Sequence, residues 1–153
     1  MGVFKYEMPV EIMRDLEKLE SKTDDIFGKM THDAAEVVYK NVLRNVPSSW
    51  RGSNIMRCIR VTKIYKTPSD DGINTKVVID GYFCPKRDSN DKIPAPLVAN
   101  AFEYGTSYRS TGDGHFTGRI AKHPFFRKSF KKSEIEKAML VAQKKYSGGL
   151  LDE

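Results

Sequence analysis

The sequence is poor in the residues that build disulfide frameworks, metal centres and membrane anchors. Its 153 residues include only two cysteines and three histidines. No apolar run approaches the roughly 18–20 residues that a helix needs to cross a bilayer. The start of the chain, residues 1–7, lacks the apolar centre and the small-residue cleavage site of a signal peptide. These absences predict a protein that is made and used in a cytoplasm, without a membrane partner.

Motifs for catalysis and metal binding are missing as well. The three histidines, His32, His115 and His123, are scattered, and no Cys-x-x-Cys or His-Glu-x-x-His spacing accompanies them. The Gly-x-Ser-x-Gly elbow of hydrolases and the Gly-x-x-x-x-Gly-Lys-Ser/Thr phosphate loop are also absent. The sequence therefore predicts no catalytic residues, no metal, no cofactor and no small-molecule substrate.

Positive charge is present in excess, and it is concentrated near the C-terminus. The formal net charge is +6, and residues 117–146 contain nine Lys or Arg against two Glu. Such a region either forms a solvated helix face or meets nucleic acid or an acidic protein surface. Lys128, Lys131 and Lys132 are therefore candidate interaction residues.

The first third of the chain predicts a long helix. Apolar residues recur at helical spacing from Val10 to Val46, and Pro47 follows. The pattern falters at residues 23–25, so one long helix, straight or kinked, and two helices meeting near residues 21–25 both fit, and we favour the single helix. A helix of this length cannot bury its whole apolar stripe against so small a domain, which indicates packing between subunits.

An antiparallel β-hairpin should follow the helix. Residues 55–67 and 74–84 alternate apolar and polar side chains around an Asp-Asp-Gly turn. The resulting register places Cys58 nearly opposite Cys84, and a reducing compartment favours two free thiols over a disulfide. In the preceding polar connector, Trp50 is either a lid on the core or an exposed contact.

The C-terminal half predicts two more helices. Pro96 begins a short one, and Ser133 with Glu136 forms a capping-box pattern that starts a terminal one. Between them, the glycine-rich and polar residues 107–118 predict a mobile loop.

The whole pattern predicts an α+β fold in a single domain, residues 1–153. A long N-terminal helix precedes the antiparallel hairpin, which stands alone or belongs to a larger, though still small, sheet, and the short and C-terminal helices pack on the sheet. Residues 1–9 and 147–153 should be frayed.

The segment between residues 101 and 130 is the most informative. Gly105 stands where a helix commonly stops in the left-handed conformation, and Pro124 restarts the chain. Glu103 lies at the unfavourable C-terminal end of a helix, so it is either exposed or paired with Arg127 or Arg119. We expect a structural hub here, formed by Glu103, Tyr104, Gly105, Thr106, His123, Pro124, Phe125, Phe126 and Arg127.

These motifs carry a family resemblance. The sequence Glu103-Tyr104-Gly105-Thr106, followed by His123-Pro124-Phe125, resembles the phage morphogenesis and tail-component family typified by gene product 10 of phage HK97. The chain also resembles the family in a second pattern, a proline, a glycine and an arginine-containing strand, at Pro47, Gly52, Arg57 and Ile59. The chain departs from the family at Arg51, where a threonine is usual, and after Arg127, where the usual proline is replaced by Lys128.

The resemblance implies a structural virion protein of the head–tail neck, active in tail completion or head–tail joining. Its implied partners are further copies of itself in a ring, six-fold by analogy, and the neighbouring neck and tail proteins. The ring would surround the DNA path without reading its sequence. The protein would be found in the virion after assembly in the cytoplasm of a bacterial host. The alternative function is a nucleic-acid-binding module that uses the basic C-terminal helix.

Overall fold

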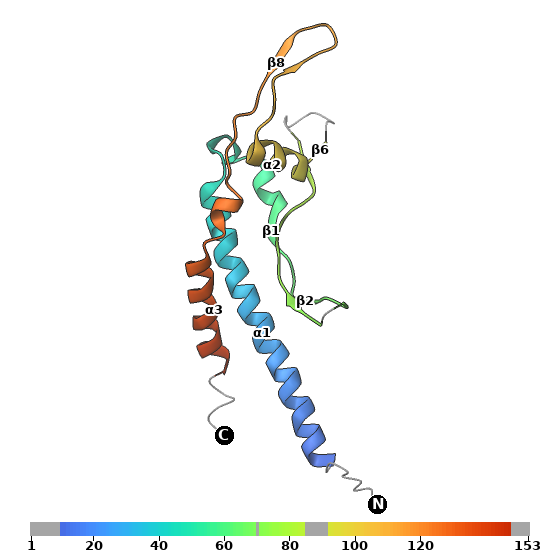
Figure 1. The fold of residues 1–153 in the computed structure, drawn as a ribbon, viewed down its shortest axis with the longest axis vertical. Helices are drawn as coiled ribbons and strands as arrows, with labels where there is room; N and C mark the ends of the chain where they lie inside the picture. Colours follow the sequence, from blue (N-terminus) through green and yellow to red (C-terminus); the bar gives the residue numbers. More distant parts are fainter. Residues whose placement is uncertain (1–9, 70, 85–91, 148–153) are drawn as a thin grey trace, which may run out of the picture.

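A single helix, α1 (Val10–Asn45), runs along most of the length of the molecule (Figure 1). The structure is a computed structural model that describes residues 10–69, 71–84 and 92–147. The prediction of one long helix is confirmed, and the alternative of two helices is wrong. The helix ends before Pro47, because proline disfavours helical geometry in the residue that precedes it. With the short strands described next, α1 produces the predicted α+β fold.

The strands form short antiparallel pairs instead of one hairpin of two long strands. β1 (Ile59–Val61) pairs with β4 (Val77–Ile79), and β2 (Tyr65–Lys66) pairs with β3 (Ile73–Asn74). A third pair joins β5 (Tyr82–Phe83) to β6 (Ile93–Pro94). The predicted first strand is wrong at its start, because Asn54–Cys58 form a 3-10 helix, η2.

The register of the hairpin also differs from the prediction. Ile59 lies opposite Ile79 and Val61 opposite Val77, so the apolar parity is confirmed but Cys58 is not opposite Cys84. Both cysteines are free thiols. Burial, and secondarily the Asp80 carboxylate, raise the pKa of the Cys58 thiol. A buried thiol that stays protonated is a poor nucleophile, so it acts here as a small apolar side chain.

The two later helices pack on different elements. α2 (Ala95–Tyr104) lies against β4, β5 and β6, as expected for a helix on the sheet. α3 (Lys132–Ser147) instead packs along α1, which corrects the prediction that it covers the sheet (Figure 1). The strands are too short to offer it an apolar face, whereas α1 has a long one. α3 begins at Lys132, one residue before the predicted serine cap.

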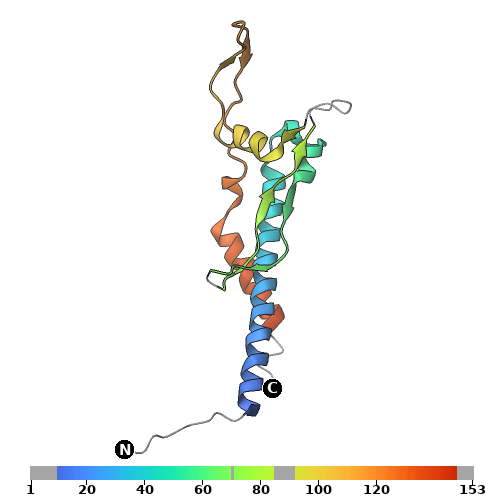
Figure 2. The same ribbon diagram turned by 90° about the vertical axis from the view of Figure 1, so that its right-hand side faces the viewer.

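The segment predicted as a loop contains a small hairpin. β7 (Arg109–Ser110) pairs with β8 (Phe116–Gly118), and the pair projects away from the other elements (Figure 2). Its side chains are all exposed, including the large ring of Phe116. The predicted mobility of this segment remains a prediction. The frayed ends predicted at 1–9 and 147–153 lie outside the described residues, apart from Ser147.

The core lies between the C-terminal half of α1, the 3-10 turns, β1 and α2. Trp50, at the end of η1 (Ser48–Trp50), is 4% exposed and packs edge-on against Phe102 and Phe125. The interpretation of Trp50 as an exposed contact is therefore wrong, and it belongs to the core. The buried cluster comprises Val38, Val42, Val46, Trp50, Ile55, Cys58, Ile59, Ala95, Ala99 and Phe125.

Candidate functional site

Glu103 lies at the centre of the predicted hub. Its side chain is only 7% exposed, although it lies in the last turn of α2, where a negative charge is unfavourable. The carboxylate accepts hydrogen bonds from the backbone N–H groups of Phe126 at 2.8 Å and Arg127 at 3.2 Å. Phe126 immediately precedes the 3-10 turn η3 (Arg127–Ser129), and Arg127 is its first residue. The carboxylate thus satisfies two N–H groups that the turn leaves unpaired.

Arg127 provides the counter-charge. Its Nε donates to Glu103 at 3.3 Å, and its guanidinium lies 4.7 Å from the centre of the Tyr104 ring. Of the two arginines that the sequence left open, Arg127 is the one that pairs with Glu103, whereas Arg119 stacks on Tyr108. The Arg127 side chain is 61% exposed, so the ion pair itself is partly screened by solvent.

A second connection joins the end of α2 to the returning chain. Gly105 has a φ of 78°. In the next residue, the backbone N–H of Thr106 donates to the carbonyl oxygen of Ile120, and the Thr106 hydroxyl accepts from the backbone N–H of Ile120. A Cβ atom at Gly105 would lie 3.1 Å from the backbone nitrogen of Lys122. Glycine is required here for two reasons, the left-handed conformation and the close approach of the neighbouring backbone.

Replacing Gly105 with valine should lower the free energy of unfolding by at least about 1–3 kcal/mol, because a β-branched residue is strained at positive φ. The contact with the backbone of Lys122 adds to this cost. Gly112→Val is the matched control, since nothing lies within 4 Å of that position and its φ is not in the left-handed region. Urea denaturation followed by circular dichroism measures both. Equal stability of the two variants would contradict the assigned role of Gly105.

The segment after the hub is fastened to the end of α1. His123 Nε2 lies 3.1 Å from the carbonyl oxygen of Asn45, one of the carbonyls that the end of the helix leaves unpaired. The backbone N–H of His123 donates to the carbonyl oxygen of Phe102 at 2.7 Å. His123 therefore links α1 to α2, which is a structural contact and not the geometry of a metal ligand. Among the described residues, no group of three or more His, Cys, Asp or Glu is arranged to hold a metal ion.

Two asparagines of α1 continue this connection, and the sequence analysis did not single them out. Asn45 Nδ2 donates to the buried Ser129 hydroxyl at 3.0 Å, and Asn41 Nδ2 donates to Glu134 at 2.6 Å. The hydrogen bond from Asn41, followed by Lys131, lowers the pKa of Glu134. Asn41 interrupts the apolar face of α1, and a polar residue on a buried face signals a buried partner. That signal was present in the sequence, but it did not identify the partner.

Replacing Glu103 with glutamine should lower the free energy of unfolding by about 1.5–3 kcal/mol, the range for hydrogen bonds to a charged group. The shape is preserved, but one of the two oxygens that accept N–H groups is lost. Glu136→Gln is the control, because its carboxylate is 58% exposed and its pairing with Lys132 at 3.6 Å is solvated. Chemical denaturation of both variants tests the difference. A Glu103→Gln variant as stable as the control would show that the carboxylate does not hold η3.

The two phenylalanines of the hub and the nearby Phe130 divide between core and surface. Phe125 is 1% exposed, while Phe126 is partly buried and Phe130 is 50% exposed. Phe126 lies between the other two, with its ring 6.3 Å from that of Phe125 and 5.3 Å from that of Phe130. The row of rings therefore runs from the core to the surface beside α3.

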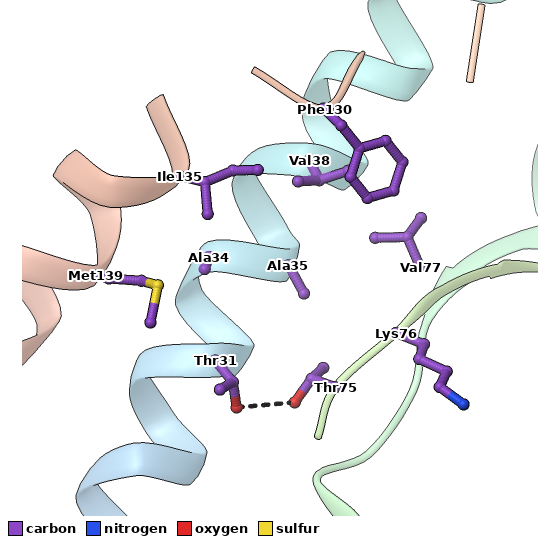
Figure 3. A pocket seen from close by; sticks show the side chains of 10 residues that line it. All are labelled: Thr31, Ala34, Ala35, Val38, Thr75, Lys76, Val77, Phe130, Ile135 and Met139. Carbon is purple, nitrogen blue, oxygen red and sulfur yellow. Dashed lines mark hydrogen bonds between the residues drawn. The ribbon is translucent and has the colours of Figure 1, made fainter. Parts of the chain in front are cut away.

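An apolar groove of about 360 Å³ opens between α1, the start of β4 and α3 (Figure 3). Thr31 and Thr75 are hydrogen-bonded across one end of it at 3.2 Å, and Phe130 lies at the other. Lys76 lines the groove, but its ammonium group points away from it (Figure 3). The lining has no acid–base pair and no nucleophile with a base. The groove marks incomplete packing between three elements and offers no catalytic chemistry.

The three candidate lysines, by contrast, lie on the surface. Lys131 pairs with Glu134 at 3.0 Å and Lys132 with Glu136 at 3.6 Å, both within or next to the first turn of α3. Lys128 is exposed beside the end of α1. The structure thus places these lysines around the start of α3, in the middle of the basic region, with two of the three charges locally compensated. None of the described helices is long and apolar enough to span a membrane.

Residues 11–81 match the model of a family described as "Bacteriophage HK97-gp10, putative tail-component". The match confirms the resemblance to this family, and it spans nearly all of α1 together with β1 to β4. It includes Pro47, Gly52, Arg57 and Ile59 but ends before the hub, so the family role of the hub residues remains a prediction. No curated protein and no solved structure gave a significant match.

Proposed function

We propose, from the similarity of residues 11–81 to the HK97-gp10 family of phage tail components, that this protein is a structural protein of the head–tail neck. It completes the tail or joins it to the head by assembling as a ring around the DNA path. It acts through contacts with its own copies and with the neighbouring neck and tail proteins, and its place is the virion.

The observation that carries this proposal lies within the matched residues. The N-terminal half of α1 extends beyond the other elements (Figures 1 and 2). Large apolar side chains along it remain about half exposed: Met13, Leu16, Leu19 and Phe27. Exposed apolar surface of this extent is typical of a protein interaction site. A binding role therefore fits the described surface better than a reaction in a pocket.

Nucleic-acid binding through the basic region is the second candidate, and the charges favour it only weakly. Lys131 and Lys132 are already paired with glutamates of α3. A filter-binding titration should therefore show weak binding to duplex DNA. This binding should fall steeply as the salt concentration rises, because it is driven by the release of counterions from the DNA. Binding that remains tight at physiological salt would favour the second candidate over the first.

The neck role is tested in a phage that carries this gene with an early stop codon. We expect infectivity to be lost and restored by the intact gene supplied from a plasmid. Negative-stain electron microscopy should then show full heads and separate tails. Tails of irregular length would indicate a role at the end of the tail tube, and tails of normal length a role at the junction. Normal infectious virions without the protein would contradict the proposed function.

A further inference from the structure

We propose that one copy of this chain binds the next by docking the N-terminal half of its α1 onto the outer face of its neighbour's α3. This inference rests on the proposed function, because it names the surfaces by which copies would assemble. The contact joins two different surfaces, so it repeats from copy to copy and can close into a ring.

The donor surface is a stripe on α1. Met13, Leu16, Glu17, Glu20 and Phe27 are exposed, and their spacing of three, four or seven residues places them on one face of the helix. The stripe combines large apolar side chains with carboxylates. Over residues 10–27 the sequence carries six acidic residues and three basic ones, so this half of α1 is net negative.

The acceptor surface is the face of α3 that points away from α1. Leu140 is 57% exposed and Val141 is 67% exposed, although neighbouring residues of the same helix are packed on α1. Lys137 precedes this pair by one turn and Lys144 follows it by one turn, and both are exposed. From Lys137 to Ser147, α3 carries three lysines and no acid. The face is therefore an apolar patch with positive charge at both ends.

The charges decide which surface the α1 stripe meets. Two α1 stripes facing each other would bring carboxylates against carboxylates, and like charges across an interface are strongly unfavourable. Against α3, the same carboxylates meet lysines while the apolar side chains meet Leu140 and Val141. The two helical segments are also similar in length, since residues 10–27 extend about 27 Å and the 16 residues of α3 about 24 Å at the rise of an α-helix.

A charge-swap experiment tests the pairing on the full chain. The Glu17→Lys/Glu20→Lys variant gives two basic surfaces, and the Lys137→Glu/Lys144→Glu variant gives two acidic ones. By sedimentation equilibrium up to about 1 mM protein, each should self-associate at least about tenfold more weakly than the wild type. Combining all four changes in one chain reverses both surfaces and should restore association. All four residues are exposed, so circular dichroism should show an unchanged fold.

The control is Lys92→Glu/Arg109→Glu, which makes the same change in net charge as Lys137→Glu/Lys144→Glu at two exposed positions, beside β6 and in β7, at the other end of the molecule (Figure 1). It should associate like the wild type. The proposal is overturned if the wild type stays monomeric up to about 1 mM. It is also overturned if Lys137→Glu/Lys144→Glu associates normally, or if the fourfold variant does not recover. Each of these outcomes leaves the neck role to the virion experiment, so the two proposals can fail separately.

Discussion

Replacing Phe125 with alanine should lower the free energy of unfolding by about 3–5 kcal/mol, the usual range for a phenylalanine removed from a packed core. The ring is 1% exposed and lies 5.0 Å from the Trp50 ring in an edge-on contact. Its removal leaves a cavity beside Trp50 and weakens the connection between α1, α2 and η3. Because small domains have a total stability of about 5–15 kcal/mol, the loss should be plain in a urea or thermal denaturation curve.

Phe116→Ala is the control for this prediction. Phe116 is 81% exposed on the projecting hairpin, so the same change of side chain should alter stability by less than about 0.5 kcal/mol. If Phe125 is a core residue, its variant should lose stability as an isolated chain. A Phe125→Ala variant that keeps the wild-type melting temperature would show that the ring is not part of the core.

Replacing Ile59 with aspartate should prevent the chain from folding into soluble protein. Ile59 is 2% exposed, and it pairs with Ile79 across the β1–β4 ladder. A carboxylate at this position would be buried without a partner, which costs several kcal/mol and approaches the whole stability of a small domain. Soluble yield and the far-ultraviolet circular dichroism spectrum measure the outcome.

Leu97→Asp is the matched control, because Leu97 is an aliphatic residue that is 62% exposed in the first turn of α2. A negative charge is tolerated near the start of a helix, so this variant should fold normally. A soluble Ile59→Asp variant with a normal melting temperature would mean that β1 does not face the core. It would also remove the basis for the apolar parity that the sequence predicted.

Some features could be predicted from the sequence because they depend on neighbouring residues. The apolar spacing from Val10 to Val46 and the following proline predicted α1, and the structure confirms a single helix. The alternation of Ile59 with Val61 and of Val77 with Ile79 predicted the paired strands. Gly105 has the positive φ expected of a glycine after a helix. In each case, the backbone preference and the side-chain pattern depend on residues that are close in the sequence.

Other features depended on contacts between distant residues, and for these the local sequence pattern gave a wrong or undecided prediction. The register that would have placed Cys58 opposite Cys84 is wrong, because Ile59 pairs with Ile79 and so Cys58 lies at the level of Asp80, whose backbone N–H donates to the carbonyl oxygen of Cys58. Cys58 itself ends η2 and is not part of β1. A small shift at one end of a hairpin changes every pair along it. The sequence also left Trp50 undecided, since a polar connector does not reveal that Phe102 and Phe125 enclose the indole ring.

The long α1 with its surplus of apolar surface, the α+β class and the resemblance to phage tail components could all be inferred from the sequence alone. These follow from periodicity, composition and short motifs, which are local properties. The folded structure was needed to identify Arg127 as the partner of Glu103, to show that Asn41 and Asn45 hold the segment around Ser129, and to show that α3 packs on α1. Those outcomes depend on which surfaces meet once the chain has folded, because hydrogen bonds and apolar burial between distant segments are set by geometry in three dimensions.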